Sequence, residues 1–174
     1  MVNIEIRQEQ SFDYTHVFTL NRIAFGQENE AKLVDALRGS GAFIPELSLV
    51  ALFDGRVVGH ILFTKLIIRN DSGNTFDSLS LAPMAVDKAF QNQGIGSQLV
   101  KAGLRKAKEL GYKSVIVLGH DHYYPRFGFK PANRWNIMAP YDVPENVFMA
   151  LELVKNSLDG INGTVEYPEE FKSA

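Results

Sequence analysis

The middle of the chain constrains the fold most strongly, because strand, turn, helix and strand patterns follow one another there. Residues 79–86 form an apolar strand pattern, and a turn with Gly94 and Gly96 comes next. A helical pattern then ends before Gly111, and residues 114–118 carry a continuous apolar run, typical of a strand buried on both faces. This order predicts a right-handed parallel strand–helix–strand unit.

The rest of the chain predicts antiparallel strands and two short helices. Two apolar runs, residues 47–53 and 56–68, are separated only by Asp54 and Gly55, the strongest short-range signal for a hairpin. Further elements are expected in a strand that alternates at Val2, Ile4 and Ile6, a helix capped by Asp13, a helix over residues 30–38, and a final strand over residues 148–153.

These elements indicate one α+β (mixed α/β) domain over residues 1–174. The chain has 174 residues, of which 45% are hydrophobic, and this is enough for one compact core. Neither an internal repeat nor a linker interrupts it. We expect a central mixed, mostly antiparallel sheet flanked by helices.

Composition excludes several classes of function. The chain has no cysteine, which excludes disulfides, thiolate metal sites and a cysteine nucleophile. A net charge of −2, without a basic run interleaved with aromatics, argues against nucleic acid. No strictly apolar run exceeds five residues, as at residues 49–53, so no membrane span is expected. The first residues lack a secretory signal, and we expect a cytoplasmic protein.

The glycine turn predicts an anion site. Gly94 and Gly96 let the backbone approach a ligand closely, and the following helix start offers unpaired N–H groups and a partial positive charge. A diphosphate fits such a site. A dinucleotide-binding fingerprint would place a third glycine at Leu99, and the lysine of a nucleotide-triphosphate loop is absent. A tight turn without a ligand is the alternative interpretation.

Pro83 suggests a slot beside the predicted strand 79–86. Proline has no N–H and interrupts the ladder, so we expect a bulge at which two parallel strands splay apart. The backbone of Met84, Ala85 and Val86 would then pair with an extended, amide-bearing ligand. A proline tolerated on a short edge strand is the competing explanation.

Two motifs resemble those of the GNAT superfamily of N-acetyltransferases. Residues 86–97 resemble its acyl-CoA-binding motif Gln/Arg-x-x-Gly-x-Gly/Ala, through Gln91, Gly94 and Gly96. Residues 123–129 resemble its Tyr-x-x-x-Gly-Phe ending, in a version found in predicted bacterial acetyltransferases whose substrates are mostly unassigned. The resemblance covers residues 79–129 closely and extends through the element order to residue 153.

The resemblance implies a GNAT-like fold with a splayed parallel strand pair and acetyl-CoA as co-substrate, without a metal. Met84, Ala85 and Val86 would pair with the pantetheine arm, and an N–H of Met84 or Ala85 would stabilise the oxyanion. A primary amine would attack the thioester directly. The loop that would hold the pyrophosphate comprises Gln91, Asn92, Gln93, Gly94, Ile95, Gly96 and Ser97.

Tyr124 aligns with the general acid that protonates the departing CoA thiolate in this family. A role in an aromatic cluster is the alternative for Tyr124, and Tyr123 is the fallback acid. An asparagine that many members carry upstream of this tyrosine is missing from residues 117–120. His120 and His122 lack further ligands for a metal, so we expect no metal site.

The acceptor amine, a small molecule or a peptide, has no legible motif, and neither does the general base. A non-catalytic acyl-CoA-binding sensor or interaction module of the same fold is the alternative function, and an enzyme that binds another nucleotide phosphate is a weaker one. The sequence does not indicate the oligomeric state.

Overall fold

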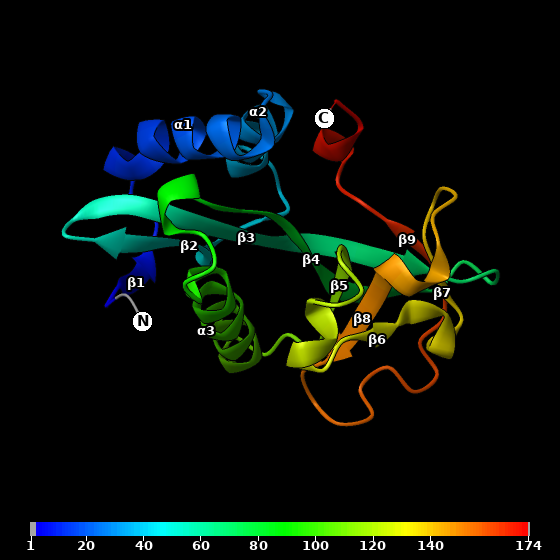
Figure 1. Cartoon of the computed structure of the whole chain (residues 1–174). Coiled ribbons are helices and arrows are strands. Elements are labelled where there is room, and N and C mark those ends of the chain that lie inside the picture. The colour runs from blue at the N-terminus through cyan, green and yellow to red at the C-terminus, as the bar shows by residue number, and fades with distance from the viewer. Residues whose placement is uncertain (1–2, 174) are drawn as a thin grey trace. The chain divides into compact units, whose positions relative to one another are not determined.

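A computed structural model describes residues 3–173 and contains a nine-stranded mixed sheet. The hydrogen-bonded strand order is β1-β2-β3-β4-β5-β8-β6, with β9 joining β3 and β7 (Figure 1). This is the predicted α+β class. Within residues 3–173, no helix combines the length and the apolar character that crossing a bilayer requires.

The chain divides into two compact units. The first comprises Met1–Thr64, Ala82–Lys106 and Glu169–Ala174, and the second comprises Lys65–Leu81 and Ala107–Pro168. Each unit is described by itself below. The predicted single domain over residues 1–174 stays a prediction.

The first unit contains three antiparallel strands, β1 (Glu5–Gln8), β2 (Phe43–Phe53) and most of β3 (Arg56–Arg69). Asp54 and Gly55 join β2 to β3 with φ values of 50° and 76°, the left-handed pair that a type I′ turn requires. The predicted hairpin is therefore confirmed. Val2 of the predicted first strand lies outside the described residues.

The helices α1 (Tyr14–Phe25) and α2 (Asn29–Arg38) cover one face of β2 and β3 (Figure 1). The carboxylate of Asp13 does not cap α1 as predicted, because it accepts hydrogen bonds from Arg7 and from the Gln10 N–H instead. The core on this face consists of Val17, Leu33, Val34, Leu37, Val50, Leu52 and Leu62. Phe171, in the C-terminal turn, packs against it.

The helix α3 (Ile95–Glu109) packs on the opposite face of β3. A Cβ atom at Gly103 would lie 2.1 Å from the Phe63 ring, and one at Gly59 would lie 3.0 Å from Leu99. Both glycines are therefore needed where helix and strand approach each other.

A buried polar cluster lies between β1, α2 and the hairpin. Arg38 donates to both Glu9 carboxylate oxygens, at 2.6 and 3.2 Å. The Ser48 hydroxyl donates to Glu9 at 2.8 Å and lies 3.0 Å from His60 Nε2. Because Ser48 has one proton and gives it to the carboxylate, His60 donates from Nε2, as a neutral ring.

The second unit is built around β5 (Ser114–Leu118), between part of β4 (Thr75–Val86) and β8 (Phe148–Glu152). β5 is antiparallel to β8 over its whole length and parallel to β4 at two residue pairs, Leu79 with Val115 and Ser80 with Ile116. The predicted parallel pair thus exists and is short.

Three short strands complete this unit, β6 (Lys130–Pro131), β7 (Ile137–Met138) and β9 (Gly163–Glu166). β6 pairs with β8, and β9 joins the end of β3 to β7. The core of the unit consists of Leu66, Ile68, Ile116, Ala132, Ile137, Phe148, Ala150, Leu158 and Val165. Single 3-10 turns span Ser11–Asp13, Lys88–Phe90, Tyr124–Phe127, Ala132–Trp135, Glu145–Val147 and Glu169–Ser173.

The free energy of unfolding should fall as the pH drops below about 6.5. Burial, together with the nearby charge of Arg38, lowers the pKa of His60 to about 3, although Glu9 lies 3.9 Å away, because Arg38 already neutralises that carboxylate. The unfolded chain therefore binds a proton that the native state excludes. Urea unfolding should give a free energy about 2 kcal/mol lower at pH 5 than at pH 7.

His60→Gln should remove most of this dependence, and His16→Gln, which changes an exposed histidine on α1, should preserve it. Hydrogen bonds from Arg7 and from the Gln10 N–H lower the pKa of the Asp13 carboxyl. Protonation of Asp13 therefore changes the free energy of unfolding only below about pH 4, outside the range from pH 5 to pH 7 that is compared here. An unchanged pH dependence in His60→Gln would contradict the assignment.

Candidate functional site

The end of β4 carries the predicted ligand-pairing residues. Ala85 is buried, whereas Met84 and Val86 are half-buried. The strand continues through Pro83 to Val86, with a cis bond between Ala82 and Pro83. The proline therefore lies within the strand.

The loop after β4 turns sharply into α3. The Asp87 carboxylate accepts a hydrogen bond from the Ala89 N–H at 2.9 Å, and the Gln91 amide donates to the Val86 carbonyl at 3.1 Å. Asn92 and Gly94 have left-handed φ values of 63° and 82°. Gln91 thus holds the loop by its side chain, while both left-handed residues are exposed.

The loop is anchored to the end of the β2–β3 hairpin. The Phe90 ring lies 5.2 Å from the Phe53 ring, and the guanidinium carbon of Arg56 lies 5.4 Å from the centroid of the Phe90 ring. The Asp87 N–H donates to the Val58 carbonyl at 2.8 Å. A backbone bond and a ring cluster thus fix the loop where it leaves β4.

The glycine turn leads directly into the positive end of α3. The Gln98 N–H donates to the Gly94 carbonyl at 3.0 Å, a bond of the first helical turn. Amides that precede such a bond have no acceptor within the helix, and the helix dipole places a partial positive charge there. Ile95 is 1% exposed and pins this helix start in the core. The start of α3 is therefore suited to an anion.

Tyr124 occupies a buried position in the second unit, with 8% of its surface exposed. Its ring makes edge contacts with Tyr123, at 5.1 Å, and with Phe129, at 5.6 Å. Burial, with a smaller effect of Tyr123, raises the pKa of Tyr124 to about 12. Its hydroxyl has no hydrogen-bond partner among residues 3–173. The aromatic packing and a free hydroxyl thus occur together at this residue.

Gly119 lies against the predicted site residue Tyr124, a contact that sequence reasoning missed. A Cβ atom there would lie 2.3 Å from the Tyr124 ring, so the ring occupies the space of a side chain. Residues 117–120 are also the stretch that lacks the asparagine of the family motif. The glycine in that stretch was the one sequence feature there that could have indicated a close contact with another segment.

The segment after β5 is tied to the turn before β8. The Gly119 N–H donates to the Val147 carbonyl at 2.9 Å, and the Asn146 amide donates to Asp121 at 2.6 Å. His122 is 97% exposed and lies 3.5 Å from Asp121. In the described part of the chain, no three His, Asp or Glu side chains are arranged to hold a metal ion.

The predicted site residues are thus distributed over both units. Residues 84–86 and 91–97 belong to the first unit, whereas Tyr124 belongs to the second. Lys101, Arg105 and Lys108 are exposed along α3.

Comparison with known proteins identifies the class. Residues 7–129 match the Acetyltransferase (GNAT) family. The chain is 36% identical to the uncharacterized N-acetyltransferase YhbS of Escherichia coli K12, over 95% of this chain and 97% of the relative. It is 41% identical to YjhQ of the same organism, over 70% of this chain and 67% of the relative.

Two crystal structures of relatives hold the cofactor. One is the GNAT family N-acetyltransferase YhbS from Escherichia coli in complex with CoA, with a TM-score of 0.90 and 34% identity, covering 99% of this chain and 93% of that one. The other is a GNAT family acetyltransferase from Brucella melitensis in complex with acetyl-CoA, with a TM-score of 0.79 and 31% identity, covering 98% and 99%.

The chain therefore belongs to the GNAT family of acetyltransferases. This confirms the predicted family, the predicted fold class and the predicted enzyme class, an acyltransferase.

Gly119→Ala should lower the free energy of unfolding by about 1–3 kcal/mol, because the added methyl group forces the Tyr124 ring out of its packed position. Urea unfolding measures this. In a Tyr124→Ala background the same substitution should cost much less, because the ring is gone.

Gly41→Ala is the matched control, since a Cβ atom there meets no atom within 4 Å. An equal cost of Gly119→Ala with and without the Tyr124 ring would contradict the proposed contact.

Proposed function

We propose that this chain transfers an acetyl group from acetyl-CoA to a primary amine by direct attack. The observation that carries the proposal is the exposed left-handed turn at Gly94, which leads into the positive end of α3. The CoA complexes of the two relatives support it.

The pyrophosphate of CoA would be bound by the loop before α3. Two phosphates carry negative charge, and the backbone N–H groups and the helix dipole offset it without a metal. Glycine at position 94 is required because other residues rarely adopt a φ of 82°. The proposed loop comprises Gln91, Asn92, Gln93, Gly94, Ile95, Gly96 and Ser97.

The pantetheine arm would pair with the backbone of Met84, Ala85 and Val86. Its amides would form strand-like hydrogen bonds there. An N–H of Met84 or Ala85 would then donate to the thioester oxygen as it becomes an oxyanion.

Tyr124 would serve as the general acid. The amine nitrogen forms a bond to the carbonyl carbon, the C–S bond breaks, and the sulfur takes up the electron pair. The Tyr124 hydroxyl donates its proton to the sulfur, and the surplus proton of the acylated nitrogen restores the phenol. A pKa of about 12 keeps this donor protonated at neutral pH.

The remaining expectations stay predictions. We propose that residues 1–174 form one catalytic domain, that the acceptor is a small-molecule or peptide amine, and that the enzyme acts in the cytoplasm.

Gly94→Ala should weaken CoA binding at least tenfold, because alanine strains a left-handed position by about 1–2 kcal/mol and shifts the surrounding amides. Isothermal titration with CoA measures the dissociation constant. Gly73→Ala is the matched control, since Gly73 has a φ of 85° and its Cβ would meet no atom within 4 Å.

Gly73→Ala should lower the free energy of unfolding through the same backbone strain, and it should leave the dissociation constant for CoA unchanged. If Gly94→Ala binds CoA as tightly as the wild type, the loop is not the pyrophosphate site.

Tyr124→Phe should lower kcat by about 10²–10⁴-fold, with little change in CoA affinity, because general acid catalysis contributes on this scale. The assay supplies acetyl-CoA with a panel of primary amines and follows release of free thiol. Tyr123→Phe, which removes a neighbouring hydroxyl, should keep most of the activity.

Unchanged turnover in Tyr124→Phe would overturn the role of Tyr124. CoA binding by the wild type without turnover of any amine would favour the non-catalytic sensor instead.

A further inference from the structure

A small pocket of about 190 Å³ lies within the first unit. It is lined by residues of α1, of the start of β3 and of the segment that follows β4. Its apolar wall includes Leu20, which is 7% exposed, and the half-buried Ala24 and Val57. The volume is below the range of pockets for drug-sized ligands, so the pocket suits a small organic molecule.

Positive charge predominates in the lining of this pocket. Arg56 and Lys88 line it and are exposed, and His16 adds an imidazole. Of the described residues that line it, only Asp87 has a carboxylate, which accepts a hydrogen bond from the Ala89 N–H at 2.9 Å. Within residues 3–173, neither Arg56 nor Lys88 forms an ion pair. Two cations are therefore left for a ligand, and one carboxylate offsets them in part.

The guanidinium of Arg56 is placed for a planar anion. Its carbon lies over the Phe90 ring, 5.4 Å from the centroid, and the Phe90 ring packs on Phe53 at 5.2 Å. A phenyl ring offers no lone pair, so the guanidinium keeps its planar fork of N–H donors. A carboxylate matches that fork with two parallel hydrogen bonds.

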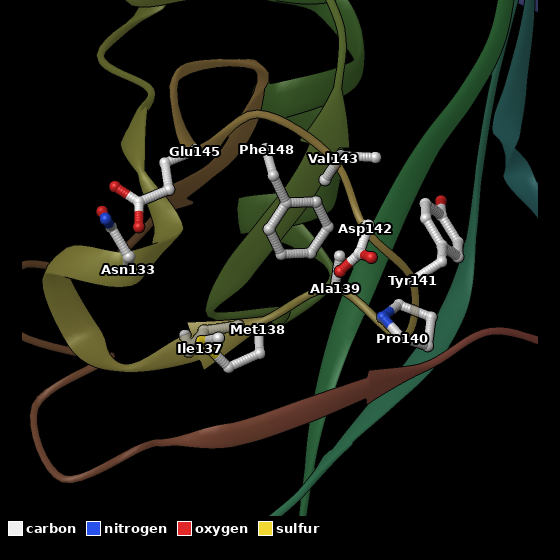
Figure 2. A pocket seen from close by; sticks show the side chains of 10 residues that line it. All are labelled: Asn133, Ile137, Met138, Ala139, Pro140, Tyr141, Asp142, Val143, Glu145 and Phe148. Carbon is white, nitrogen blue, oxygen red and sulfur yellow. The ribbon is translucent and has the colours of Figure 1, made fainter.

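The charge distinguishes this pocket from a larger cavity in the second unit, of about 340 Å³ (Figure 2). Asp142 and Glu145 line that cavity, and its described lining contains neither lysine, arginine nor histidine. Figure 2 shows the two carboxylates on either side of the Phe148 ring. An anion is therefore attracted to the pocket of the first unit and repelled from the cavity of the second.

The pocket adjoins the proposed cofactor segment of the same unit. Two of its lining residues, Asp87 and Lys88, directly follow Val86, the last residue of β4. The Asp87 N–H donates to the Val58 carbonyl at 2.8 Å, which fixes this segment on β3. A ligand at Lys88 therefore contacts the segment that leads into the proposed pyrophosphate loop.

We infer that this pocket binds a small carboxylate ligand with an apolar body, at a site separate from that of the cofactor. Arg56 and Lys88 pair with the carboxylate, and the apolar wall buries the body. The carboxylate belongs either to an independent ligand or to an acidic group of the acceptor, and the recognition is the same for both. Only the second source rests on the proposed acetyl transfer.

The test compares benzoate with benzamide, a neutral probe of nearly the same shape, by NMR titration of the full chain without CoA. The backbone amide signals of Thr19, Val57 and Lys88 should shift on binding, whereas those of Met138 and Phe148, at the cavity of the second unit, should not. Benzoate should bind about fivefold more tightly than benzamide, the scale of one exposed ion pair.

The double variant Arg56→Gln, Lys88→Gln should lose this preference, because neutral side chains replace both cations at exposed positions. Arg22→Gln, at an exposed cation of α1 outside the pocket lining, should keep it. Equal binding of the two probes by the wild type, or an undiminished preference in the double variant, would overturn the inference. Saturating CoA should leave benzoate binding in place, and displacement of benzoate by CoA would overturn the separate site by assigning the pocket to the cofactor phosphates.

Thiol release from acetyl-CoA distinguishes the two sources of the carboxylate. The acceptors compared are 4-(aminomethyl)benzoate and 4-(aminomethyl)benzamide. If the double variant raises KM for the acid alone, the carboxylate belongs to the acceptor. If KM is unchanged for both while benzoate binding is lost, the pocket takes an independent ligand. Selective benzoate binding without turnover of any amine would contradict acetyl transfer alone, because the binding is measured directly.

Discussion

The close contact between α3 and β3 is the constraint on which the proposed cofactor loop depends. Because Phe63 fills the space of a side chain at Gly103, the helix lies directly on the strand. Ile95 is buried at the other end of this contact, so the first turn of α3 is held against the sheet. The loop of residues 91–94 can then expose its backbone N–H groups while its position relative to α3 stays fixed. Fixed donors of this kind cost little reorganisation when an anion arrives.

A second contact of the same kind, in the other unit, positions Tyr124. The ring rests on Gly119, and the backbone of Gly119 is bonded to the turn before β8. Aromatic neighbours then bury the ring, and in the described part of the chain its hydroxyl has no hydrogen-bond partner. In each unit, a glycine leaves open the space that one aromatic ring fills, and this contact fixes the position of the ring.

Sequence patterns predicted the elements whose pairing is local. The turn at Asp54 and Gly55 predicted the hairpin, and the helix predicted to end before Gly111 ends at Glu109. Strand β9 was missed because its four residues pair with β3, about a hundred positions away, and nothing in its own composition signals that partner. The Asp13 cap was wrong because Arg7, six residues earlier, takes the carboxylate. Gly119 was missed because its close contact with the Tyr124 ring depends on how two segments of the chain meet, which the sequence of neither segment shows.

The raised pKa of Tyr124 limits how the proposed acid can work. A phenol with a pKa near 12 holds its proton more tightly than a thiolate, whose conjugate thiol has a pKa of about 8.5, by about three orders of magnitude. Lasting transfer to a free thiolate is therefore unfavourable, and Tyr124 contributes most as a hydrogen-bond donor while charge develops on the sulfur. The proton that the acylated nitrogen releases restores the phenol, so the net proton gained by CoA comes from the attacking amine.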